Sequence, residues 1–222
     1  MNAKIKTPNE LRAEKGKEQI GRKVGTAKAN RALKEKEFLQ LMEFMNKDKD
    51  TRLSTLNKYK KIFTFLFYTG CRINEVLKLK TEDIQNILQH GEARILTTKT
   101  GRFKGQEFRT VYFSTTAIET IKEVFCDVLH NKESYCIRAW NNKDKEMNPI
   151  GLANQINKYL EKVFGHKDFT THSFRRGIIT EMILDKDIKP EIVQAFIGHK
   201  NYATTTRYVK PSCEDIKANL VR

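Results

Sequence analysis

The chain has 222 residues, which is enough to bury one sizeable hydrophobic core. Its 42 Lys and Arg residues outnumber its 27 Asp and Glu residues and leave a net charge of +15, which favours a polyanionic partner. A membrane is the competing polyanion, but the longest clean apolar run, residues 62–68, is far too short to cross a bilayer, and no apolar stretch of a secretory signal follows the first lysines. We therefore expect an intracellular protein that associates with nucleic acid and has no membrane partner.

The four cysteines do not show the pattern of a metal site. Cys71, Cys126, Cys136 and Cys213 form no C-x-x-C pair and have no histidine at zinc-finger spacing. Most of them lie beside apolar residues, where a free thiol behaves as a small hydrophobic group. We expect reduced cysteines that fill the core, and neither a metal nor a cofactor.

The N-terminal segment differs in composition from the rest of the chain. Residues 1–31 carry nine Lys or Arg residues against three Glu and contain no apolar stripe. This composition predicts a flexible basic arm. The remainder, residues 32–222, has the apolar periodicity of a single folded domain.

The periodic segments predict a mainly α fold. Residues 93–98 and 108–113 are rich in β-branched and aromatic side chains and flank a stretch that contains Gly101 and Gly105, which predicts a β-hairpin with a long loop. Apolar stripes at spacings of three and four, a break at Thr69-Gly70 and a possible cap at Ser212 mark the helices. These are expected over residues 33–45, 56–67, 76–79, 118–129, 152–163, 178–183, 192–197 and from 212 onward. The predicted fold class is mainly α with a small antiparallel β-sheet (α+β).

Six polar residues are informative through their order along the chain, and none of them is informative by itself. Each has an ordinary structural explanation when it stands alone, such as an exposed ion pair, a helix cap or a packing aromatic. The set consists of Arg72, Lys99, His172, Arg175, His199 and Tyr208.

The spacing of this set matches a known pattern. The segment Thr69-Gly70-Cys71-Arg72-Ile73-Asn74-Glu75 precedes Lys99 of the predicted hairpin; His172-Ser173-Phe174-Arg175 and Gly198-His199 follow, and Tyr208 stands nine residues after His199. Over residues 32–215 the chain thus resembles the catalytic domain of the tyrosine recombinase (phage integrase) family. That family shows T-G-x-R-x-x-E, a lysine on a β-hairpin, H-x-x-R, G-H and a tyrosine.

The resemblance implies how a phosphate would be handled. It implies the tyrosine recombinase/integrase catalytic-domain fold and site-specific recombination of double-stranded DNA. Arg72 and Arg175 would neutralise the pentacovalent transition state, because a guanidinium is always charged and can grip two phosphate oxygens. His172 and His199 would donate hydrogen bonds to the same phosphate and help to move protons.

The resemblance also implies a covalent intermediate. Tyr208 would be the nucleophile that forms a 3′-phosphotyrosine, and Lys99 would protonate the 5′-oxygen that leaves. The covalent bond conserves the energy of the broken phosphodiester, so neither ATP nor a metal is expected. The family recombines DNA within a homotetramer, and residues 212–222 are expected to dock on a neighbouring subunit.

The chain departs from the family pattern at several positions. Lys104 is a second lysine in the hairpin loop, although Lys99 is favoured as the catalytic one. Tyr112 and Gly177 stand where the family often has a proline and a small hydroxyl residue. Only residues 1–31 precede the catalytic domain, so we expect the separate N-terminal core-binding domain of typical members to be missing.

Two other functional interpretations remain open at this point. A type IB topoisomerase or a telomere resolvase shares the Arg/Lys/Arg/His/Tyr set, although H-x-x-R followed by G-H fits a recombinase better. A non-catalytic or architectural DNA-binding relative is the other, although no candidate catalytic residue has been lost. The sequence specifies neither the target DNA nor whether the role is integration, excision, inversion or resolution.

Overall fold

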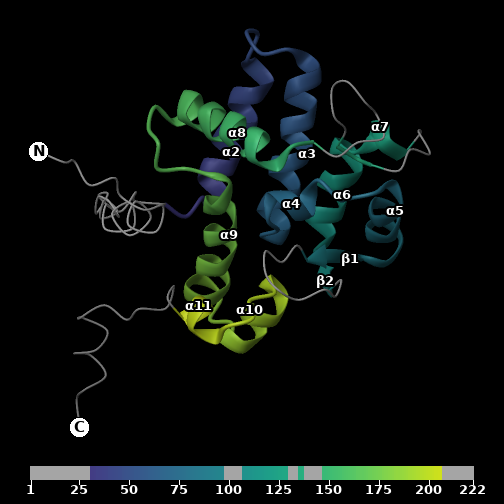
Figure 1. The fold of residues 1–222 in the computed structure, drawn as a ribbon, viewed down its shortest axis with the longest axis vertical. Helices are drawn as coiled ribbons and strands as arrows, with labels where there is room; N and C mark the ends of the chain where they lie inside the picture. Colours follow the sequence, from purple (N-terminus) through teal and green to yellow (C-terminus); the bar gives the residue numbers. More distant parts are fainter. Residues whose placement is uncertain (1–30, 98–106, 130–134, 138–146, 207–222) are drawn as a thin grey trace, which may run out of the picture.

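A computed structural model describes residues 31–97, 107–129, 135–137 and 147–206, and these residues form a mainly helical domain with one two-stranded sheet (Figure 1). Residues 1–30 of the predicted basic arm, Lys99, Tyr208 and the predicted C-terminal helix therefore lie outside the described residues. The elements are α2 (Glu35–Lys47), α3 (Leu53–Thr69), α4 (Ile73–Val76), α5 (Thr81–His90), β1 (Glu92–Thr97), β2 (Glu107–Tyr112), α6 (Thr115–Val124), α7 (Cys126–Leu129), α8 (Pro149–Phe164), α9 (Thr171–Thr180), the π-helical turn η1 (Glu181–Asp185), α10 (Pro190–Ile197) and α11 (Tyr202–Thr206). The predicted fold class is confirmed.

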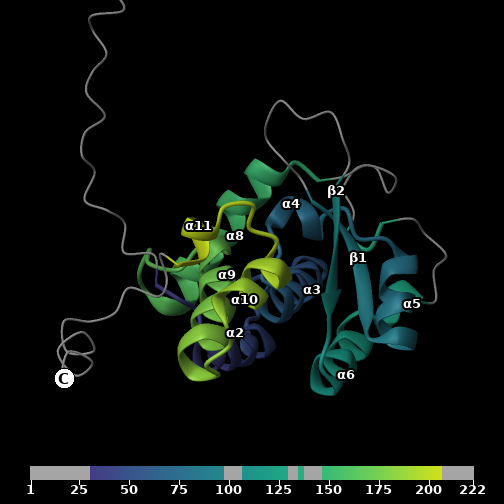
Figure 2. The same ribbon diagram turned by 90° about the horizontal axis from the view of Figure 1, so that it is seen from below.

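Helix α3 is the centre of the core. Its apolar side chains face several neighbours at once, and Ile62, Phe63, Phe65 and Leu66 are fully buried. The rings of Phe63 and Phe174 stack with centroids 5.5 Å apart, which attaches α9 to α3. Helix α6 packs on α3 as well, and α5 packs on β1. Figure 2 shows the sheet beside α5 and α6, while α9 and α11 lie across α3 from it; α10 contacts β2.

The sheet is antiparallel, and its register places alternate residues in the core. Ile95 pairs with Arg109 and Ala93 pairs with Val111. Ala93, Ile95 and Val111 are buried, as the period of two requires. Within the described residues, β1 begins and β2 ends one residue earlier than expected from the sequence. The strands lead into and out of the segment that contains Lys99.

Some elements differ from the prediction. Helix α5 was not expected, because only Thr81, Ile84 and Ile87 of its ten residues are buried and the apolar signal is weak. The stripe over 118–129 is interrupted at Phe125, which separates α6 from α7. The predicted helix around 178–183 continues α9 into the π-helical turn η1.

Leu33 is buried but does not belong to a helix. Its backbone N–H donates to the Ser173 carbonyl at 3.0 Å, so the chain crosses α9 before α2 begins. At the crossing, an added Cβ on Gly177 would stand 1.9 Å from the Leu33 carbonyl oxygen. This close approach explains the glycine where the family often has a hydroxyl residue.

The cysteine prediction is partly confirmed. Cys71 and Cys136 are free and buried, as expected of core residues, whereas Cys126 is free and exposed on α7. Cys126 follows the helix break at Phe125 and points away from the core, so the apolar neighbours in sequence were misleading. No helix within the described ranges combines the length and the apolar character needed to cross a membrane.

Candidate active site

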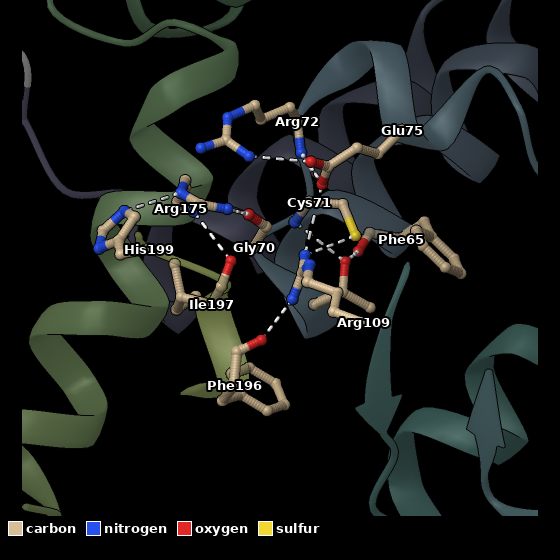
Figure 3. A network of polar contacts seen from close by, with 11 residues as sticks. Phe65, Gly70, Cys71, Arg72, Glu75, Arg109, Arg175, Phe196, Ile197 and His199 are labelled. Carbon is tan, nitrogen blue, oxygen red and sulfur yellow. Dashed lines mark hydrogen bonds and ion pairs between the residues drawn. The ribbon is translucent and has the colours of Figure 1, made fainter. Parts of the chain in front are cut away.

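The four described members of the predicted set come together around the turn between α3 and α4. Arg72 caps α4, His172 and Arg175 lie on α9, and His199 follows the end of α10. Figure 3 shows Arg72, Arg175 and His199 gathered at this turn. Lys99 and Tyr208 belong to the predicted set but lie outside the described residues.

Arg175 is held by neutral acceptors in a nearly buried position. Its Nη1 donates to the Gly70 carbonyl at 2.7 Å and its Nη2 donates to the Ile197 carbonyl at 2.9 Å, while Nε donates to Nε2 of His199 at 3.4 Å. Burial first, and then the charges of Arg72 and Arg109, lower the pKa of Arg175 to about 10. The side chain therefore remains charged at neutral pH. Within the described residues these bonds use three of the five guanidinium N–H groups, which leaves two for a ligand.

Arg72 is more exposed and is held by a carboxylate. Its Nη1 donates to Glu75 Oε1 at 2.9 Å, and its backbone N–H donates to Oε2 of the same residue at 3.0 Å. The Arg72 side chain is 38% exposed, whereas that of Glu75 is fully buried. Burial works against ionisation of Glu75, but the backbone N–H of Arg72 and the charges of Arg109 and Arg72 together hold its pKa below the usual value. Glu75 thereby orients the Arg72 side chain.

His199 is neutral at neutral pH. Burial first, and then the charges of Arg175, Arg72 and Arg109, lower its pKa to about 4. Because Nε2 accepts from Arg175, the ring proton lies on Nδ1, which donates to Thr205 Oγ1 at 2.9 Å. Thr205 of α11 is fully buried and was not anticipated from the sequence.

His172 occupies the first turn of α9 with an exposed side chain. Its backbone N–H donates to the cap Thr170 Oγ1 at 3.3 Å, so the ring is carried by a capped helix start. The surrounding protein lowers its pKa, first by partial burial and then by the charges of Arg175 and Arg72. His172 and His199 are thus both biased toward the neutral imidazole.

A third arginine lies at the base of the site. Arg109 of β2 reaches the same turn from the sheet and is 8% exposed. It forms an ion pair with Glu75, with Nη2 3.4 Å from Oε2. Arg109 was not predicted as a site residue; its signal in the sequence is a charged residue at a core position of an alternating strand.

Two glycines allow these parts to approach each other. Gly70 ends α3 with φ 59°, and a Cβ there would stand 2.8 Å from Ile178 Cγ2 and from Ile197 Cδ1. Gly198 ends α10 with φ 72°, and a Cβ there would stand 2.7 Å from Arg109 Cδ. Both the left-handed backbone and the close contacts require glycine.

The electrostatics of the site favour an anion. Three guanidinium groups surround a single buried carboxylate, that of Glu75, and each arginine contributes to the lowered pKa of His199. A negatively charged ligand would offset this repulsion. Within the described ranges, no three His, Cys, Asp or Glu side chains cluster as metal ligands would.

Comparisons with known proteins agree with this arrangement. Residues 31–214 match the model of the phage integrase family. A probable integrase/recombinase protein from Methanocaldococcus jannaschii is 30% identical over 152 residues, covering 66% of this chain and 44% of the relative. The tyrosine recombinase XerA from Pyrococcus horikoshii is 26% identical over 158 residues, covering 71% and 52%. The chain thus spans about half the length of these relatives.

A solved structure shares the fold. The XerH site-specific recombinase, bound to its palindromic difH substrate in a post-cleavage complex, superposes with a TM-score of 0.64 at 19% identity, covering 86% of this chain and 52% of XerH. The motif order in the sequence, the gathered arginines and the family match all lead to one assignment. The chain belongs to the phage integrase family, the family of tyrosine recombinases.

Proposed function

We propose that this chain is the catalytic domain of a site-specific recombinase that cleaves and rejoins double-stranded DNA through a 3′-phosphotyrosine at Tyr208. The observation that carries the proposal is that Arg72 and Arg175 converge beside neutral His199. The three residues come from different elements, because Arg72 caps α4, Arg175 lies on α9 and His199 follows α10. The relatives named above are recombinases, and XerH is bound to a DNA substrate.

The two arginines provide the charge that phosphoryl transfer requires. A pentacovalent phosphate develops negative charge on its non-bridging oxygens, and fixed guanidinium donors stabilise that charge without reorganising. Arg175 keeps two N–H groups for this purpose, and Arg72 lies more open to solvent. A bound phosphate would also raise the pKa of His199, because it would offset the nearby positive charges.

The remaining catalytic groups are assigned by the family resemblance and by chain connectivity. Thr205 contacts His199, and Tyr208 follows Thr205 by three positions in the sequence. Lys99 likewise follows the last described residue of β1, Thr97, by two positions. Both residues are therefore tethered to elements of the site.

The proposed reaction balances without a cofactor. The Tyr208 oxygen attacks phosphorus and loses its proton to the neutral imidazole of His172, because both ring nitrogens of His199 already have hydrogen-bond partners. The bond from phosphorus to the 5′-oxygen breaks, and Lys99 supplies the proton to that oxygen. The new phosphotyrosine bond retains the energy of the phosphodiester, so a 5′-hydroxyl can reverse the step without ATP or a metal. Recombination itself would take place in a homotetramer on DNA.

A covalent trap tests this proposal and identifies the target DNA in the same experiment. A pool of duplexes with randomised sequence and a fixed nick is incubated with the protein. Cleavage beside the nick releases a short fragment that carries the 5′-hydroxyl, so covalent adducts accumulate and survive detergent. Sequencing the attached DNA then gives the target sequence.

The wild type should form adducts that the Tyr208→Phe variant cannot form, because only the attacking hydroxyl is removed. The variant should still bind the recovered duplex, which serves as the control for folding. EDTA should leave adduct formation in place. Adducts at wild-type level in Tyr208→Phe, or a strict need for a divalent metal, would show that the mechanism is wrong.

A further inference from the structure

Arg109 is a charged side chain on the buried face of the two-stranded sheet. It pairs across the strands with Ile95, and Ala93 and Val111 share its face. These three apolar residues are at most 2% exposed, and Arg109 is only 8% exposed. An apolar residue would satisfy the alternating pattern of β2 at this position, so the charge requires another explanation.

The guanidinium of Arg109 joins three segments that are distant in sequence. Its Nη1 donates to the Phe196 carbonyl at the end of α10, and its Nη2 contacts Cys71 Sγ at 3.0 Å and Glu75 Oε2 at 3.4 Å (Figure 3). Its side chain also packs against Gly198, where no Cβ could be accommodated. A single side chain of β2 thus contacts α4, the turn before it and the end of α10.

Stability alone does not account for this arrangement. A buried ion pair is often no more stabilising than an apolar side chain of similar volume, because both charges must leave water. Arg109 Nε is buried and has no hydrogen-bond partner within the described part of the chain, which adds to that cost. The benefit must therefore lie in what the contacts position.

The contacts of Arg109 lead to both halves of the candidate site. On one side, Glu75 accepts from Arg109 and also from the backbone and side chain of Arg72. On the other side, Phe196 precedes Ile197, whose carbonyl accepts from Arg175. Fixing Glu75 and the end of α10 to one guanidinium therefore fixes the placement of Arg72 relative to Arg175.

We propose that Arg109 is a positioning residue that holds Arg72, through Glu75, and Arg175 with His199, through the end of α10, at the separation needed to grip one phosphate. It also ties this pair to the strand that resumes after the segment containing Lys99. The inference rests on the proposed function, since it assigns a role in the same phosphoryl transfer. Arg109 itself does not touch the reacting phosphate in this scheme.

The decisive comparison is between two Arg→Lys variants in the same sheet. Arg109→Lys keeps the charge but cannot reach Glu75 and the Phe196 carbonyl together. Arg94→Lys is the matched control, because Arg94 is exposed on the opposite face, with its guanidinium 4.6 Å from the Phe108 ring centroid. Both variants keep the net charge and hence the general attraction to DNA.

The readout is the maximal single-turnover rate of adduct formation at saturating DNA, with the dissociation constant measured separately. Arg109→Lys should slow the maximal rate by about 10-fold to 100-fold, the scale expected when catalytic groups are misplaced by an ångström or less. Its DNA affinity, and both quantities for Arg94→Lys, should stay within about twofold of the wild type. Rates are compared below the lowest unfolding temperature of the set.

A double-mutant cycle tests the route through Glu75. If Arg109 acts by holding Glu75, the double variant Arg109→Lys/Glu75→Gln should lose little more than the worse single variant. Losses that multiply would overturn this route. Should Arg109→Lys fail to fold, Cys71→Ala loosens the same guanidinium while keeping the ion pair, and it should slow the maximal rate by about threefold.

The outcomes separate this inference from the proposed function. A wild-type protein that forms no adduct defeats the proposed function and this inference with it. Wild-type adducts, together with Arg109→Lys and Cys71→Ala rates equal to that of Arg94→Lys, defeat only the role of Arg109. A lowered melting temperature with an unchanged maximal rate would likewise show that Arg109 serves stability alone.

Discussion

The two arginines of the site are held in opposite ways. Arg175 is nearly buried and bonds to two backbone carbonyls and a neutral imidazole, so its full charge is retained. Arg72 is partly exposed and bonds to the Glu75 carboxylate, which offsets much of its charge. Burying the Arg175 guanidinium costs desolvation free energy. Burial also strengthens its electrostatic attraction for an anion, because water screens the charge less. We infer that Arg175 is the principal positive charge for a bound phosphate and that Arg72, whose charge Glu75 partly offsets, contributes less.

The largest expected effect comes from replacing the Arg175 guanidinium, which donates several hydrogen bonds at once. Arg175→Lys keeps a charge but cannot serve the Gly70 and Ile197 carbonyls, His199 and a phosphate together. Adduct formation should fall by roughly 10²-fold or more, as when one oxyanion-type donor is lost. Arg72→Lys should cost only about 10-fold, because its charge is already partly offset. Equal losses in single-turnover assays on the recovered duplex would remove the distinction between the two arginines.

A second prediction concerns the turn that supports Arg175. Gly70→Ala should lower the free energy of unfolding by about 2–4 kcal/mol, the sum of a left-handed alanine and overpacking against Ile178 and Ile197. Gly165→Ala is the matched control, because Gly165 has φ 75° and an added Cβ would meet nothing within 4 Å. It should lose only about 1 kcal/mol. Urea denaturation of both variants measures the difference, and similar losses would mean that the turn is not tightly packed.

The third prediction follows from the protonation of His199 beside Arg175. Its pKa is about 4 in the folded chain, against an ordinary value of 6.5. As the pH falls from 6.5 to 4, the unfolded chain binds the proton first, so stability is lost across this window and no further below it. The loss should be on the order of 2 kcal/mol after allowance for partial solvent screening.

The variant His199→Gln isolates this contribution, because glutamine does not titrate. The difference in unfolding free energy between wild type and variant should change between pH 7 and pH 4 and be flat at lower pH. His172, whose pKa is also lowered, remains in both proteins and cancels. A difference that does not change with pH would contradict the burial of a neutral His199.

The smallest expected effect concerns the support of the His199 ring. Thr205→Val removes the hydroxyl that faces Nδ1 at 2.9 Å and keeps the shape of the side chain. The unfolding free energy should fall by about 1 kcal/mol, and adduct formation should slow by a few-fold. Thr204→Val, on the more exposed side of α11, should change neither. If Thr204→Val and Thr205→Val behave alike, the imidazole is oriented by Arg175 alone.

Predictions from the sequence agree with the structure where a local pattern carries the information. The apolar stripe of α3, the break at Gly70 and the hairpin strands are local properties of spacing and backbone sterics. The structure has the break where it was expected, β1 and β2 within one residue and the ends of α3 within three residues. The candidate residues were recognised because a family pattern fixes their order along the chain. Helix α5 was missed because its apolar stripe is too short.

The properties of the site itself depend on tertiary structure. The acceptors of Arg175 are the backbone carbonyls of Gly70 and Ile197, which carry no side-chain signal in the sequence. Arg109 looked like an ordinary strand residue until the register placed it in the core. The sequence by itself determined the family, the order of the elements other than α5 and the chemical groups available. Only the tertiary structure decided which arginine is buried and which proton His199 carries, because both depend on desolvation and on charges from segments distant in sequence.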